Sequence, residues 1–166
     1  ITPSVFTYEF AKALSYEAER KEKVTKIHIK IDTGMSRIGF LAGENNEEIV
    51  DEIIKISKLP YIEIEGIFSH FATSDEYDKS YTLLQYGRFM DVCNRLEEKG
   101  LNIPIKHICN SAGIMMYPEM HLDMVRPGVI LYGMYPSDEV DKSRLDLIPA
   151  MTLKSTITHL SLIHIS

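Results

Sequence analysis

The stretch that decides the fold is Lys26-Ile-His-Ile-Lys-Ile-Asp-Thr-Gly-Met-Ser-Arg-Ile-Gly-Phe40. Its first part alternates, with isoleucines on one face and His28, Lys30 and Asp32 on the other, which predicts a strand whose isoleucine face is buried. The chain then turns at a glycine and presents Arg37. Charged side chains at the carboxyl end of a buried strand are typical of sites in α/β proteins.

The composition of the 166 residues indicates one soluble globular domain at most, with 45% hydrophobic and 25% charged residues. The net charge of −6 argues against a nucleic-acid partner, which needs a clustered basic surface. No apolar run approaches the roughly 18 residues of a membrane span. The start at Ile1 is unlike a signal peptide and resembles the interior of a longer chain. We therefore expect a cytoplasmic protein in which Cys93 and Cys109 are reduced and buried.

Strand-like and helix-like segments alternate, which predicts a parallel sheet built from βα units. The predicted strands are 5–8, 26–32, 62–70, 105–109 and 124–132, the last interrupted by Pro127-Gly128. The predicted helices are 9–20, 45–57, 81–99 and 111–116. A closed barrel of this type has eight strands. We therefore expect residues 1–148 to form about the second half of a (β/α)8 TIM-type barrel. Residues 149–166, in which 151–160 alternate again, are expected to begin a truncated C-terminal β domain.

Polar groups follow four of the predicted strands, in the order Lys30 with Arg37, His70, Asn110 with Ser111, and Arg126 with Gly128 and Val129. Taken singly, each has an ordinary structural explanation, such as a solvated lysine, a core histidine, a helix cap or a turn. In a parallel sheet all four groups lie at one edge. The resulting positive charge predicts a site for a small anion, such as a phosphorylated cofactor or a carboxylate substrate. The sequence contains no P-loop, Rossmann fingerprint or metal-ligand spacing.

At these residues the chain resembles the alanine racemase family of pyridoxal 5′-phosphate (PLP) enzymes. The resemblance lies in four stretches that follow the family's order, KIDTGMSRIG at 30–39, FSHFATSD at 68–75, HICNSA at 107–112 and MVRPGVILYG at 124–133. Ser36 stands where many members have glycine. The resemblance implies a homodimeric enzyme with PLP as cofactor that interconverts L- and D-alanine for cell-wall synthesis.

The resemblance also implies roles for individual residues. Lys30 matches a lysine that is carbamylated in many members and orients Arg37, which faces the substrate carboxylate. His70 matches a histidine packed against the cofactor ring. Arg126 matches an arginine that hydrogen-bonds the pyridine nitrogen, and His107 a histidine behind that arginine.

The cofactor's phosphate is the implied partner of four further residues. Asn110 and Ser111 match positions near it, with Ser111 a direct ligand, and Gly128 and Val129 match backbone donors to it. The implied arginine at the pyridine nitrogen suits the chemistry of a racemase. An arginine keeps its proton because its pKa exceeds about 12, which leaves the pyridine largely unprotonated and limits side reactions.

We expect the pKa of Lys30 to be lowered, because burial and a neighbouring cation such as Arg37 both lower an amine's pKa. The neutral amine of Lys30 can react with CO₂, and the resulting carbamate would pair with Arg37. We treat this carbamylation as a hypothesis.

Two catalytic groups of the family are expected outside this chain. The lysine that binds the cofactor is expected upstream of Ile1, and the opposing tyrosine downstream of Ser166, reaching the site from the other subunit. Racemisation needs an acid–base group on each face of the Cα plane, so we expect the chain alone to be inactive. Three alternatives stay open: a serine or lysine racemase, a non-catalytic PLP-binding barrel, and a half-barrel without a ligand.

Overall fold

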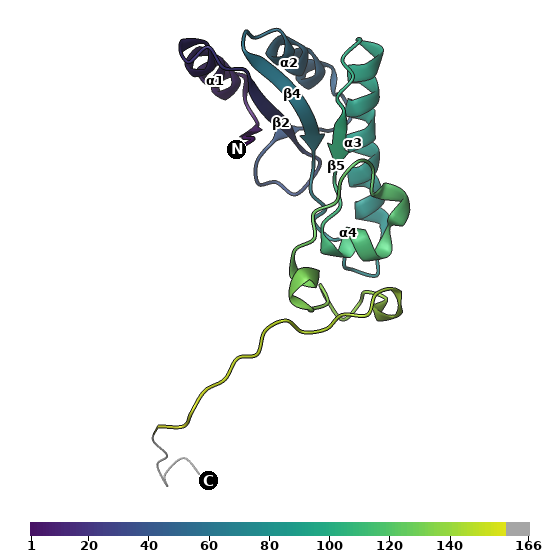
Figure 1. The fold of residues 1–166 in the computed structure, drawn as a ribbon. Coiled ribbons are helices and arrows are strands. Elements are labelled where there is room, and N and C mark those ends of the chain that lie inside the picture. Colours follow the sequence, from purple (N-terminus) through teal and green to yellow (C-terminus); the bar gives the residue numbers. More distant parts are fainter. Residues whose placement is uncertain (159–166) are drawn as a thin grey trace.

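The structure is a computed structural model that describes residues 1–158 (Figure 1). Its body is an open sheet in the strand order β1-β2-β4-β5, with β3 paired to the end of β2. The strands are β1 (Ser4–Val5), β2 (Thr25–Asp32), β3 (Phe40–Leu41), β4 (Ile62–Phe68) and β5 (Ile105–His107). Every pairing is parallel, as predicted, and the described residues form no closed barrel.

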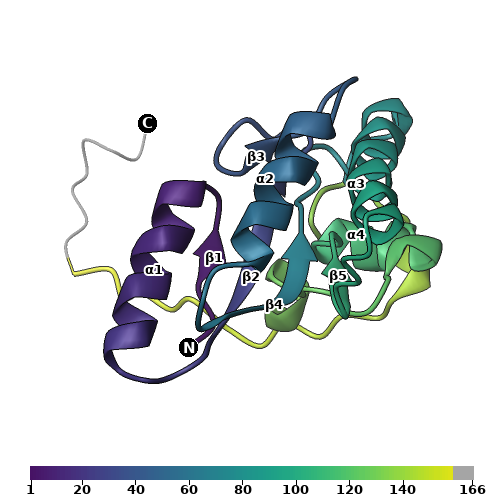
Figure 2. The same cartoon turned by 90° about the horizontal axis from the view of Figure 1, so that it is seen from above.

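Three long helices lie side by side over one face of this sheet (Figure 2). They are α1 (Tyr8–Arg20), α2 (Glu47–Ser57) and α3 (Ser80–Glu98). The short helix α4 (Ser111–Met116) follows β5, and the 3-10 turns are η1 (Pro118–Met120), η2 (Val129–Tyr132) and η3 (Lys142–Arg144). Within the described chain no helix combines the length and apolarity needed to cross a membrane.

The isoleucine face of β2 forms the centre of the core, as the alternation predicts. Ile27, Ile29 and Ile31 are fully buried, and they belong to the same cluster as Val50 and Ile53 of α2. Each buried side chain of this size contributes roughly 1.5–3 kcal/mol to folding. The opposite face of β2, which carries His28 and Lys30, is thereby turned away from the helices.

The prediction of a strand at 124–132 is wrong. Arg126 N donates to Cys109 O at 3.0 Å and Asp123 N to Lys106 O at 3.1 Å, so the start of the segment runs beside β5 without forming a regular ladder. Pro127 has no N–H to continue the pairing, and the chain then coils into η2.

Three other boundaries differ from the predictions. The strands predicted at 62–70 and 105–109 both end two residues earlier, and the segment predicted as a strand at 5–8 ends at Val5. Thr7 caps α1 by accepting from Phe10 N at 3.2 Å, which starts the helix at Tyr8. Residues 151–158 form no strand, and the end of that prediction lies outside the described residues. The domain boundary at residue 148 stays a prediction.

Candidate functional site

A pocket of about 310 Å³ lies beyond the carboxyl ends of β4 and β5. Its lining consists of His70, Asp75, Asn110, Ser111, Ala112, Arg126, Gly128, Val129 and Pro136. All six residues that were predicted to hold a cofactor are in this lining. The parallel sheet explains the convergence, because the segments that follow neighbouring strands leave the sheet at the same edge.

Arg126 is the best-connected side chain of the pocket. Its Nη2 donates to Ser69 O at 2.7 Å and to Ile108 O at 3.2 Å, and it lies 3.2 Å from His70 Nδ1. Its Nη1 contacts His107 Nδ1. Among the described residues, these contacts engage both terminal nitrogens and none involves Nε. These contacts hold the guanidinium in place, and the Nε–H and one N–H of Nη1 have no acceptor among the described residues.

Both histidines beside Arg126 are kept neutral. Burial, with the charges of Arg126, Arg37 and Lys30, lowers the pKa of His70 to about 4. Burial and the charge of Arg126 lower the pKa of His107 to about 3. Because arginine can only donate, both rings must accept from it at Nδ1.

The start of α4 and the segment before η2 meet at one hydroxyl. Gly128 N donates to Ser111 Oγ at 2.8 Å. Asn110 caps α4, because its Oδ1 accepts from Gly113 N and from Ser74 Oγ, each at 2.9 Å. The amide of Asn110 therefore shapes the pocket wall, and the hydroxyl of Ser111 is the side-chain group presented next to the Gly128 backbone.

Lys30 lies beside the pocket but not in its lining. It is only 3% exposed, and its Nζ donates to Ile31 O at 2.7 Å. Its Nζ lies 5.5 Å from the centroid of the Phe68 ring, and Arg126 Cζ lies 5.3 Å from the same centroid. Burial is the main cause that lowers the pKa of Lys30 to about 8, against the opposing charge of Asp32.

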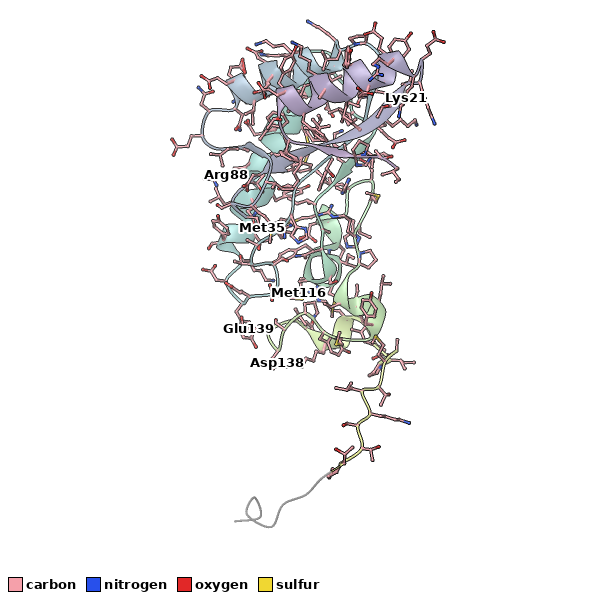
Figure 3. All side chains as sticks on the ribbon, turned by 90° about the vertical axis from the view of Figure 1, so that its left-hand side faces the viewer. Lys21, Met35, Arg88, Met116, Asp138 and Glu139 are labelled. Carbon is pink, nitrogen blue, oxygen red and sulfur yellow. The ribbon has the colours of Figure 1, made fainter. Side chains whose placement is uncertain are left out.

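Arg37 is exposed on the loop between β2 and β3 and is not part of the pocket lining. It forms no ion pair with any residue in the range 1–158. Its charge nevertheless reaches the pocket edge, because it lowers the pKa of both Lys30 and His70. Arg88 of α3 holds the loop by donating to Thr33 O at 3.2 Å, and Figure 3 shows Arg88 and Met35 on the same side of the molecule.

Sequence reasoning missed Gln85, a fully buried amide of α3. It accepts from Ala72 N at 2.8 Å and donates to His70 O at 3.1 Å and Thr33 Oγ1 at 3.2 Å, so it ties the segments after β2 and β4 together. The sequence did contain an indication of its burial, because Gln85 lies four residues before the buried Phe89, on the same face of the helix. Asp75, Ala112 and Pro136 also line the pocket without having been predicted.

A parallel α/β sheet with a polar pocket at its strands' carboxyl ends is the arrangement in which α/β proteins bind small ligands. Comparison with known proteins makes this class specific. The family described as alanine racemase, N-terminal domain, matches residues 1–136. The chain belongs to the alanine racemase family.

Relatives and solved structures agree with this assignment. The chain is 57% identical over 160 residues to an alanine racemase of Clostridium tetani, covering 96% of this chain and 41% of the relative. It is 52% identical over 159 residues to an alanine racemase of Methanococcus maripaludis, covering 96% and 42%. The structure of an alanine racemase of Clostridium difficile 630 matches with a TM-score of 0.91 and 48% identity, over 97% of this chain and 44% of that chain. The chain thus spans 41–42% of the length of these curated relatives.

Proposed function

We propose that the protein containing this chain is a PLP-dependent alanine racemase, a cytoplasmic homodimer that interconverts L- and D-alanine and supplies D-alanine for cell-wall precursors. The observation that carries the proposal is the convergence of six residues, implied separately by the resemblance, on one pocket. The names of the relatives support alanine as the substrate.

The residues of the pocket fit this cofactor. The Ser111 hydroxyl and the backbone N–H of Val129 are the kind of donors that bind a phosphate. The N–H of Gly128, which donates to Ser111 Oγ in this structure, would exchange that partner for a phosphate oxygen. Arg126 contributes a positive charge that no carboxylate of the described residues neutralises by an ion pair. Asp75 is the opposing feature, since its carboxylate adds negative charge to the lining.

When bound, PLP supplies an electron sink for the carbanion left after the substrate Cα loses its proton. The chain's own residues would hold the cofactor ring and the substrate. Burial lowers the pKa of Arg126, yet a guanidinium still stays protonated near neutral pH, so it would donate a hydrogen bond to a ring nitrogen of the bound cofactor and keep its own proton. His70 is neutral and offers a ring surface. The exposed guanidinium of Arg37 suits a substrate carboxylate.

The direct test compares Ser111→Ala with wild type in the complete protein. Losing one hydrogen bond to a phosphate costs about 1.5–3 kcal/mol, so PLP affinity should fall about tenfold to a hundredfold, measured by titration of the cofactor's absorbance. Ser143→Ala is the matched control, because Ser143 lies in η3 outside the pocket. Equal PLP affinity in S111A and wild type would contradict the proposed phosphate site.

The substrate is tested by the same complete protein with alanine, serine and lysine as competing substrates. We expect the largest kcat/KM for alanine. Faster racemisation of serine or lysine would overturn the substrate assignment, and binding of PLP without any racemisation would favour the non-catalytic barrel.

A further inference from the structure

A line of side chains leads away from the pocket on the sheet face that the three long helices leave uncovered. It begins at Arg126, whose Nη1 contacts His107 Nδ1. His107 Nε2 lies 3.0 Å from His28 Nδ1, and His28 Nε2 lies 3.6 Å from Glu65 Oε2. Lys26 Nζ ends the line, 2.7 Å from Glu65 Oε1. The last histidine contact is longer than a hydrogen bond and acts through charge.

Arg126 at one end of this line and Glu65 at the other favour the same direction of hydrogen-bond donation through the two histidines. Arg126 can only donate, so His107 accepts at Nδ1 and carries its proton on Nε2. That proton points at His28, which therefore accepts at Nδ1 and carries its own proton on Nε2. This second proton faces the Glu65 carboxylate, an acceptor only. An anion at one end and a cation at the other thus favour one tautomer in both rings.

The backbone makes special room for His28. The pairing of β2 with β4 shifts register between Ile27 and His28, which places His28 opposite Gly66. A Cβ on Gly66 would come within 2.5–2.7 Å of three atoms of the His28 ring. Register shifts of this kind re-aim a side chain. Beside it, the rings of Phe68 and His107 stack at 4.8 Å and 4°, which fixes the plane of the second histidine.

We propose that Glu65 and His28 are positioning residues that set the tautomer of His107 and, through it, the orientation of the Arg126 guanidinium in the pocket. The link to the cofactor rests on the proposed function, whereas the tautomer assignment does not. Neither Glu65 nor His28 lines the pocket, so their effect passes through His107 and Arg126.

The charge states of the rings agree with this arrangement. Burial lowers the pKa of His28, and burial with the charge of Arg126 lowers the pKa of His107 to about 3. Each ring is therefore neutral near pH 7 and offers one donor and one acceptor, as the line requires.

The experiment measures the tautomers of His28 and His107 by ¹⁵N NMR of the complete protein, labelled at histidine and stripped of cofactor. We expect the proton on Nε2 in both rings of the wild type. In Glu65→Gln the new amide can donate to His28 Nε2, which lets the His28 proton move to Nδ1 and disturbs His107. Glu63→Gln is the matched control, because Glu63 also approaches Lys26, at 3.5 Å, but is not a contact of His28. An unchanged His28 tautomer in E65Q, or an equal change in E63Q, would overturn the proposal.

The second measurement tests whether the line reaches the pocket. Gly66→Ala displaces the His28 ring without altering Glu65, and Glu65→Gln keeps the ring in place. In PLP-loaded complete protein, both variants should lower kcat about fivefold to tenfold with little change in KM, and shift the pH dependence of the cofactor's absorbance. E63Q should match wild type. Normal kcat and absorbance in both variants would refute the coupling to Arg126. Failure of the wild type to bind PLP would instead refute the proposed function and leave the tautomer result standing.

Discussion

At the scale of single residues, the main feature of the pocket is the positive charge of Arg126, whose hydrogen-bond acceptors in the described chain are all uncharged. Arg126 is partly buried, yet its partners are two backbone carbonyls and two histidine rings. Burial of a charge without an opposite charge is unfavourable, so such a group gains most from a bound anion. Lys30 differs, because its buried amine contacts a carbonyl and an aromatic ring but also interacts with the opposite charge of Asp32.

We predict that Lys30 is carbamylated in the complete protein. Its pKa of about 8 leaves part of the amine neutral near pH 7, and the nitrogen can then bond to CO₂ with release of a proton. The carbamate would be attracted by the charges of Arg37 and Arg126. Incubation with ¹³C-bicarbonate should give a carbamate signal by NMR that is absent from Lys30→Gln. Identical spectra for the two proteins would disprove the modification.

We predict that the protein loses stability as the pH falls from about 7 to 5. His70 and His107 have pKa values of about 4 and about 3 when folded, below the roughly 6.5 of an unfolded histidine. In this window the unfolded chain binds more protons than the folded one, so the free energy of unfolding declines, by on the order of 1–2 kcal/mol per histidine. Urea unfolding of the complete protein at each pH measures the decline. His107→Gln should flatten it, and an unchanged slope would argue against a neutral buried His107.

At the scale of elements, sequence patterns predicted what long periodic segments form. Alternation found the core strand at 26–32, and helical spacing found α1, α2 and α3 to within two residues at each end. The two-residue β3 is too short to show a period. The segment at 124–132 was predicted as a strand interrupted at Pro127-Gly128, but the strand pairing does not resume after the interruption, because Pro127 lacks an N–H donor and the chain then coils into η2.

The site was predictable where a polar residue follows a strand, and His70, Ser111 and Arg126 meet as expected. The sheet's parallel order supplies that convergence. The position of Arg37 was not predictable, because a loop's path is set by contacts from elsewhere, such as the hydrogen bond from Tyr81 Oη to Gly34 O at 2.8 Å. Gln85 shows the same limit, since its three partners belong to two other segments.

We predict that Gln85→Leu destabilises the complete protein by about 2–3 kcal/mol. Leucine fills a similar volume but breaks three hydrogen bonds and leaves buried partners unsatisfied. Because His70 O is one of these partners, PLP affinity should fall as well. Asn94→Leu on the exposed side of α3 makes the same chemical change and should stay within about 0.5 kcal/mol of wild type. Equal urea midpoints for the two variants would show that Gln85 does not hold the strand ends together.

At the scale of the whole molecule, one face of the sheet is left without covering helices in the described chain. Parallel sheets are usually covered on both faces, but the three long helices cover only one face here (Figure 2). In η2 and just after it the chain exposes large apolar side chains, among them Leu131, Tyr132 and Met134. Residues 151–158 then extend away from the α/β body (Figure 1). The strand order places β1 and β5 at the sheet's two ends, and exposed sheet edges favour association.

We predict that the 166-residue chain produced alone self-associates and forms no D-alanine from L-alanine and PLP. Racemisation requires acid–base groups on opposite faces of the substrate Cα, and the ionisable groups lining the pocket are His70, Asp75 and Arg126. His70 stays neutral, Arg126 holds its proton, and Asp75 alone cannot serve both faces. Light scattering measures the association, and chiral chromatography compares D-alanine with a no-protein blank and with the complete protein. D-Alanine above the blank from the chain alone would mean that its own residues supply both acid–base groups.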